Sequence, residues 1–95
     1  MVRVTIEPQA ATNVKVLIQA AVDNQLRIIE FGIAGTKAKL QELENRLGMA
    51  SEDFYRQFSE GKLGDDMEYI RWAGEYETLE KLQRDYDDLR NTQLC

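Results

Sequence analysis

The sequence contains no histidine, and its one cysteine, Cys95, is the last residue. Histidine is the commonest general base and nitrogen ligand in proteins, and zinc sites usually need several thiolates. A single cysteine also excludes a disulfide within the chain, which fits a reducing compartment. We therefore expect a cytoplasmic protein with no catalytic residue, no metal site and no cofactor.

Long apolar runs are also missing. The longest apolar stretches are interrupted by Asp23, Arg27 and Glu30, so we expect no segment that spans a membrane. Residues 1–9 alternate polar and apolar side chains, which does not resemble a signal peptide.

The polar clusters that do occur lack a catalytic pattern. Residues 61–64, Gly-Lys-Leu-Gly, do not match the spaced glycines followed by Lys and Ser or Thr of a phosphate-binding loop. Asp65, Asp66 and Glu68 do not have calcium-loop spacing, and acids at the start of a helix are favoured by its dipole. We expect neither an enzyme nor a small-molecule substrate.

Charge is unevenly distributed along the chain. Residues 1–48 contain six Lys or Arg and five Asp or Glu, whereas residues 49–95 contain six Lys or Arg and twelve Asp or Glu. The second half therefore carries a net charge of −6 and should repel nucleic acid phosphates. It would complement a basic protein surface, or else serve only as a solvated helix face.

The length of 95 residues favours a single domain, residues 1–95. Its first element is predicted to be a short strand over residues 1–8, because Val2, Val4 and Ile6 alternate with polar residues. A lone strand has two unpaired edges and no second strand is evident, so we expect it to pair with the same strand of a second copy.

A long helix is predicted over residues 12–47, with Thr12 or Asn13 as its N-cap. Apolar residues and one threonine follow the alternating three- and four-residue steps of a heptad: Leu26, Ile29, Ile33, Thr36, Leu40, Leu43 and Leu47. Gly32 and Gly35 lie within this pattern, and we interpret them as a weak point of a continuous helix, with a hinge as the alternative. The predicted homodimer uses the strand and the seam: Val2, Val4, Ile6, Leu26, Ile29, Ile33 and Leu40.

Two further helices are predicted after Gly48, which has the position of a C-terminal helix cap. Ser51 would cap a short helix over 51–60, and Asp65 or Asp66 an acidic amphipathic helix over 66–91. The expected fold class is thus mainly α, with a short N-terminal β-strand, one long helix, a short helix and a C-terminal amphipathic helix, dimeric through the strand and long helix.

One segment of the second half resembles a known family. The pattern begins with Gly48-Met49 and continues with Phe54, Phe58, Gly61-Lys62-Leu63-Gly64-Asp65-Asp66 and Trp72. It is similar to a signature of small prokaryotic antitoxin-like proteins, many of them uncharacterised. The resemblance implies a short strand, a long helix and an acidic helix, in a non-catalytic protein that neutralises a small toxin by direct binding.

The acidic helix is accordingly the candidate partner surface. Aromatic and acidic residues are favoured there as contacts to a basic protein. The candidates are Trp72, Tyr76, Glu75, Glu80 and Asp87. Core packing is the alternative explanation for the aromatic residues.

Two other functions remain open at this point. Antitoxins commonly repress their own promoter, so an N-terminal β-ribbon could present Arg3 and Thr5 to DNA, although Glu7 would face it too. A homo-oligomeric structural or adaptor role is the remaining alternative.

Overall fold

The computed structural model describes residues 3–4 and 11–94, and three helices make up most of this part of the chain. Helix α1 spans Ala11–Leu47, α2 spans Ser51–Ser59 and α3 spans Met67–Arg90. Two segments of two residues each, β1 (Arg3–Val4) and β2 (Gln93–Leu94), pair in parallel. The predicted helical character is confirmed.

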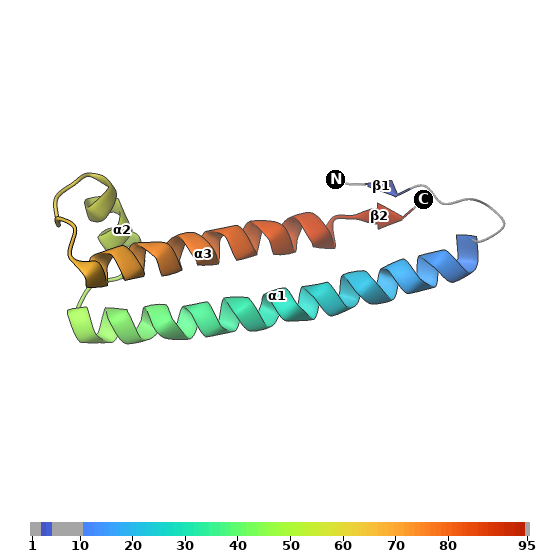
Figure 1. Cartoon of the computed structure of the whole chain (residues 1–95), viewed down its shortest axis with the longest axis horizontal. Helices are drawn as coiled ribbons and strands as arrows, with labels where there is room; N and C mark the ends of the chain where they lie inside the picture. Colours follow the sequence, from blue (N-terminus) through green and yellow to red (C-terminus); the bar gives the residue numbers. More distant parts are fainter. Residues whose placement is uncertain (1–2, 5–10, 95) are drawn as a thin grey trace.

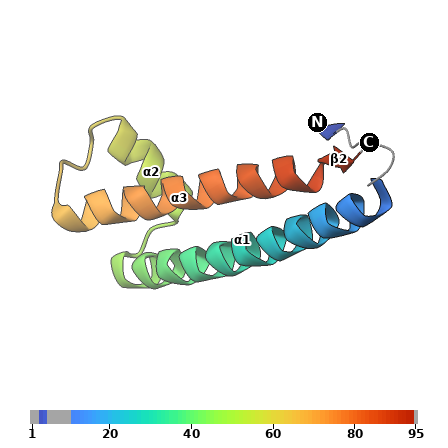
Figure 2. The ribbon, with the colours of Figure 1, turned by 45° about the vertical axis from the view of Figure 1, so that its right-hand side comes forward.

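Helices α1 and α3 form a long antiparallel hairpin, and α2 lies beside its closed end (Figure 1, Figure 2). Arg46 near the end of α1 pairs with Glu68 at the start of α3, whereas Glu30 accepts a hydrogen bond from Tyr86 near the end of α3. The heptad seam of α1 is the face that α3 covers, because Ile29 and Leu40 are buried there.

Helix α1 is continuous through its two glycines. A Cβ atom on Gly32 would lie 3.2 Å from Cδ1 of Leu82, so α3 approaches the backbone of α1 closely at this point. Gly35 has no neighbouring atom within 4 Å of its Cβ position. The helix therefore tolerates two residues of low helix propensity. Only at Gly32 would a larger side chain meet a neighbouring residue.

The turn between α1 and α2 contains Gly48, which ends α1, and leads to Ser51, whose side chain bonds to Trp72 instead of capping α2. Gly48 has a φ of 72°, the left-handed conformation that ends many helices. Ser51 does not cap α2 as predicted, since Ala50 holds the N-cap position without a side-chain hydrogen bond. The Ser51 hydroxyl instead accepts a hydrogen bond of 2.9 Å from Nε1 of Trp72.

A small aromatic core joins α2 to the hairpin. Phe54 and Trp72, 0% and 1% exposed, stack with ring centroids 3.9 Å apart and an interplanar angle of 5°. Leu40 and Ala73 complete the buried cluster. The loop that leads from α2 to α3 ends at Asp66, whose carboxylate accepts the backbone N–H of Glu68 and caps α3.

The predicted fold class is wrong in its N-terminal part. The expected strand over 1–8 is not an element of the fold: within the described residues, only Arg3 and Val4 form an extended pair there. Their partners are Gln93 and Leu94 of the same chain, not a second copy. The C-terminal residues satisfy the edge that the sequence left without a partner, so the predicted ribbon across a dimer axis has no basis.

The hairpin is thin and its two helices differ in length. Helix α1 has 37 residues and α3 has 24, so the first part of α1 extends past the end of α3 (Figure 1). The molecule measures 59 × 22 × 17 Å along its principal axes. Within the described part of the chain, no helix is long and apolar enough to cross a membrane.

Candidate protein-interaction surface

One face of α3 carries several of the predicted contact residues. Tyr76, Glu80 and Asp87 are four and seven residues apart, which places them on the same side of the helix. Glu80 and Asp87 are exposed, and Tyr76 is half-buried. The spacing therefore aligns one aromatic ring and two free carboxylates along α3.

Helix α2 adds a second tyrosine to this face. The rings of Tyr55 and Tyr76 stack with centroids 4.8 Å apart at an interplanar angle of 29°. Both side chains are half-buried, so part of each ring reaches solvent. The pair is fixed in place because Phe54, the residue before Tyr55, is anchored in the core against Trp72.

Carboxylates surround the two rings. Burial raises the pKa of Tyr55, and the negative charges of Glu77 and Glu80 raise it further. Burial also raises the pKa of Tyr76, with added contributions from Glu80 and Glu52. We call this group, Tyr55, Tyr76, Glu52, Glu77 and Glu80, the acidic tyrosine surface.

Such a surface is suited to a lysine or arginine side chain. A cation is attracted both by the carboxylates and by the face of a tyrosine ring. Tyrosine is also enriched among the residues that contribute most to protein interfaces. The carboxylates and the ring faces therefore together form a surface that attracts a cationic side chain.

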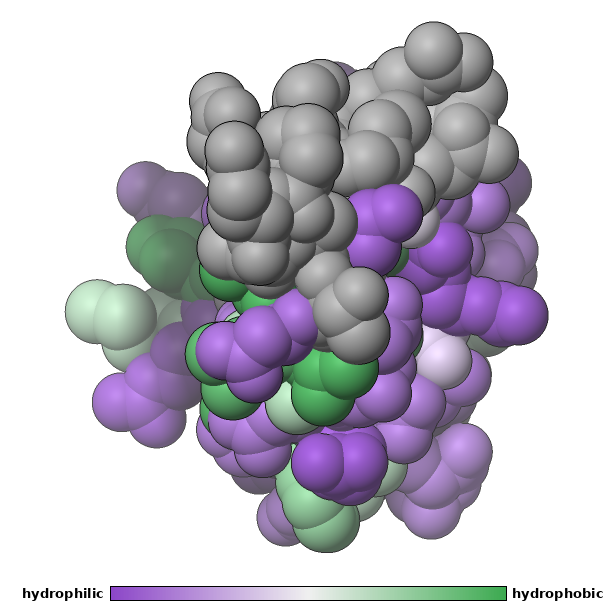
Figure 3. All heavy atoms as spheres, turned by 90° about the vertical axis from the view of Figure 1, so that its right-hand side faces the viewer, coloured by the Kyte–Doolittle hydropathy of each residue, from purple (hydrophilic) through white to green (hydrophobic). Residues whose placement is uncertain are grey.

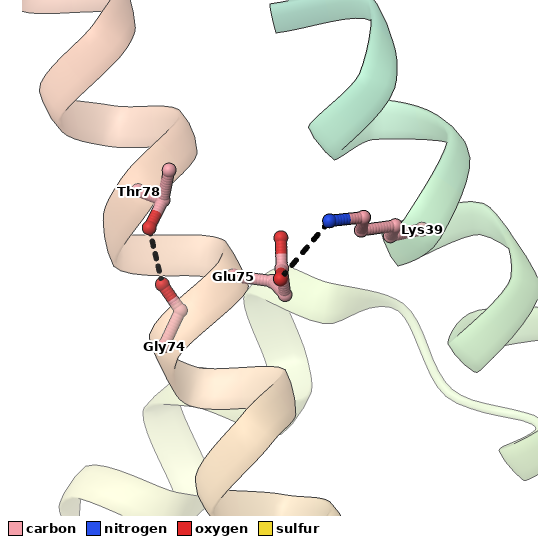
Figure 4. A network of polar contacts seen from close by, with 4 residues as sticks. All are labelled: Lys39, Gly74, Glu75 and Thr78. Atoms are coloured by element: carbon pink, nitrogen blue, oxygen red, sulfur yellow. Dashed lines mark hydrogen bonds and ion pairs between the residues drawn. The ribbon is translucent and has the colours of Figure 1, made fainter. Parts of the chain in front are cut away.

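Two of the predicted contact residues are engaged by other residues of the same chain. Trp72 is buried and hydrogen-bonded to Ser51, so it offers no surface to a partner in this conformation. Glu75 lies between the helices, with its Oε1 3.6 Å from Nζ of Lys39 in α1 (Figure 4). Trp72 faces inward because the apolar stripe of α3 is turned towards α1 and α2, whereas Glu75 lies at the edge of the contact with α1.

The residues predicted for dimerisation are used within the chain or lie outside the described part. Ile29 and Leu40 are buried, and Leu26 and Ile33 are half-buried. Val4 belongs to β1. Val2 and Ile6 lie outside the described residues.

The predicted DNA contacts are not brought together as a ribbon. Arg3 pairs through its backbone with Gln93 of the same chain, and Thr5 lies outside the described residues. The expected strand is wrong as a fold element, and DNA binding by these residues stays a prediction.

Over residues 3–4 and 11–94, no group of three or more Asp, Glu or Cys side chains is placed to hold a metal ion. A groove of about 570 Å³ beside the start of α3 contains acids and bases together, including Lys39, Arg46, Glu68 and Glu75. Its charges are largely paired with one another.

Tyr55 is the functional candidate that the sequence did not reveal. It follows Phe54 directly, and neighbouring residues on a helix point in different directions. Core packing accounts for the other aromatic residues of this region, and it gave no reason to single out Tyr55. Only the packing of α2 on α3 shows that Tyr55 stacks on Tyr76 at the surface.

Comparison with protein-family models, curated proteins and solved structures found no significant match to this chain. The similarity of residues 48–72 to antitoxin-like proteins therefore stays a prediction.

Proposed function

We propose that this chain is a non-catalytic, antitoxin-like module that binds and neutralises a basic partner protein through its acidic tyrosine surface. The observation that supports this most directly is the stacked pair of Tyr55 and Tyr76 with carboxylates around it. The partner's Lys or Arg side chains would neutralise the excess acid of α3 and cover the exposed parts of the rings.

Charge reversal tests the proposal. The double variant Glu77→Lys, Glu80→Lys should lose most of the near-stoichiometric partner recovered in a pull-down from native extract, because both carboxylates are exposed and take no part in the core. Glu75 is unsuitable for this experiment, since its reversal would also disturb the contact with Lys39.

A matched control changes the net charge equally elsewhere. Asp23→Lys, Asp65→Lys removes two exposed acids outside the acidic tyrosine surface and should retain the partner. Equal recovery with both double variants would reject this surface. Equal loss with both would indicate attraction by net charge alone, without a defined site.

A homo-oligomeric structural or adaptor role is the second candidate function. It is favoured by the exposed apolar residues of α1, which have no role in binding a partner through α3.

A further inference from the structure

The side of α1 turned away from its seam carries a second heptad stripe. Phe31 is 77% exposed, Leu17 60% and Ile28 53%, and the three lie on one side of the helix. Four smaller residues continue the same face at alternating steps of four and three residues. We call the whole set the outer stripe: Leu17, Ala21, Asn24, Ile28, Phe31, Gly35 and Ala38. It shares no residue with the seam that packs on α3.

The outer stripe contains no charged residue over 22 positions, in a chain of which 31% is charged. The free side of a surface helix normally collects charges, because they interact well with water. A heptad of apolar and small residues is instead the pattern by which one helix packs on another. The outer stripe therefore has the composition of an interface.

The first half of α1 is only partly packed, since its apolar residues Val14, Ile18, Val22 and Leu26 are half-buried. Among the described side chains, none from residue 13 to residue 28 is buried. A helical segment of this length is marginal in water unless one of its faces is covered. Figure 3 views this end of the molecule and shows hydrophobic spheres gathered in the middle of it.

An apolar groove adjoins the outer stripe. It lies between α1 and the end of α3, has a volume of about 770 Å³ and is lined by Ile18, Val22, Ile29, Leu82 and Leu89 among others. Ile28 borders the groove and belongs to the stripe as well. At Ile28 the apolar surface of the outer stripe is therefore continuous with that of the groove.

We propose that a second copy of this chain docks on the outer stripe, α1 against α1 and antiparallel, so that the two α1 helices lie at the centre of the dimer and each α3 lies on the outside. With the two-fold axis near residue 26, Leu17 faces Gly35 of the second copy, Ala21 faces Phe31 and Asn24 faces Ile28. Every layer then combines one large side chain with a small or polar one, which keeps the spacing of the helices even. A parallel pair would place Phe31 against Phe31 and Gly35 against Gly35.

Charge and area both fit a second copy. Helix α1 has five basic and four acidic residues, whereas α3 has four basic and seven acidic ones. Packing through α1 therefore brings together nearly neutral helices and keeps the repelling α3 helices apart. Phe31 alone leaves roughly 150 Å² to cover, and the stripes of two copies together approach roughly 1,000 Å², the lower limit for a specific interface.

The oligomeric state of the full chain tests this arrangement. Wild-type protein should sediment as a dimer, and Phe31→Glu should raise the dissociation constant about 100-fold or more. The ring of Phe31 is mostly outside the hairpin, so the helical circular dichroism of the variant should remain. Ile70→Glu is the matched control, because Ile70 is an exposed apolar residue of α3, 47% exposed, outside the outer stripe.

Ile70→Glu should remain dimeric. A monomeric wild type at about 100 μM, or an equal effect of the two substitutions, would overturn the proposal. Should Phe31→Glu lose its helical signal, Ile28→Glu provides the same comparison with Ile70→Glu.

Cross-linking tests the orientation. In a Cys95→Ser background, Leu17→Cys mixed with Gly35→Cys should form a disulfide between different variants under mild oxidation, and Leu17→Cys alone should not. Gly35 has room for the added side chain in the hairpin itself. Efficient coupling of Leu17→Cys to itself would contradict the antiparallel arrangement.

Discussion

At the scale of single residues, the contact between Trp72 and Ser51 fixes the position of α2. The indole N–H is buried and its one hydrogen bond in the structure goes to the serine hydroxyl, 21 residues earlier in the chain. A buried donor that loses its partner costs more free energy than the bond contributes when it is formed. The hydroxyl of Ser51 is therefore a structural requirement and not a helix cap.

Ser51→Ala should lower the free energy of unfolding by about 1–3 kcal/mol, because the indole N–H would remain buried without an acceptor. Urea denaturation followed by circular dichroism measures the change. Thr78→Ala is the control: its exposed hydroxyl donates to the carbonyl of Gly74 within the same helix (Figure 4), and its loss should change stability by less than about 0.5 kcal/mol. Similar losses of unfolding free energy in the two variants would show that the buried hydrogen bond contributes no more to stability than the exposed one.

The two stacked tyrosines predict a dependence of stability on pH. The pKa of Tyr55 and of Tyr76 is raised above the ordinary value of 10.0 in the folded protein, first by burial and then by nearby carboxylates. The folded chain thus holds these phenol protons more tightly than the unfolded chain does. Their stabilising effect is complete below pH 10 and is lost as the pH rises from there through the folded-state pKa.

Denaturation at pH 8 and at a pH near 11 should therefore show a smaller decline for the variant Tyr55→Phe, Tyr76→Phe than for the wild type. The phenylalanine rings keep the stacking but cannot ionise. An identical decline in both proteins would mean that other groups cause the alkaline loss of stability.

At the scale of the helices, two glycines distinguish the effect of tertiary packing from the effect of helix propensity. Gly32 and Gly74 both lie inside helices, but only Gly32 faces a neighbour across the hairpin, Leu82 of α3. A Cβ atom on Gly74 would have no atom within 4 Å. The same substitution should therefore have different effects at the two positions.

Gly74→Ala should stabilise the protein by about 1 kcal/mol, since alanine loses less backbone entropy in a helix than glycine does. Gly32→Ala should stabilise the protein clearly less than Gly74→Ala, because the side chain of Leu82 must shift to make room for the added methyl group. Thermal unfolding of the two variants beside the wild type measures the difference. Equal stabilisation would show that the contact between α1 and α3 at Leu82 is loose.

At the scale of the whole molecule, the hairpin is far more extended than an ordinary domain. Its Cα radius of gyration is 18.6 Å, whereas a compact chain of this length would have about 12 Å. The buried cluster of Leu40, Phe54, Trp72 and Ala73 lies at one end, where α2 covers the hairpin. The stability of the opposite end, formed by the first half of α1, depends on the second copy that we propose to cover the outer stripe.

Hydrogen exchange should reveal this asymmetry in the Phe31→Glu variant. Amides of residues 13–25 should exchange much faster than those of residues 36–45, which face the buried cluster. In the wild-type dimer the first segment should be protected by the second copy. Uniform protection along α1 in a proven monomer would contradict the inference that its first half is less well packed than its second.

The sequence by itself determined the helices and the turns between them. Heptad spacing placed the long helix, and the structure has it at Ala11–Leu47 where 12–47 was expected. Gly48 and Asp66 have the backbone conformation and the capping bond that their residue types favour. These features depend on residues close together in the chain, so local chemistry is sufficient to predict them.

Only the tertiary structure decided which surfaces meet. The pairing of Arg3–Val4 with Gln93–Leu94 joins the two ends of the chain, and no local pattern reveals such a contact. The seam of α1 covers its own α3 instead of a second copy because a connection of about twenty residues brings α3 back along it. Likewise, the burial of Trp72 and the half-buried position of Tyr55 against Tyr76 follow from the packing of α2 on α3, since the amphipathic pattern of one helix does not specify its neighbour.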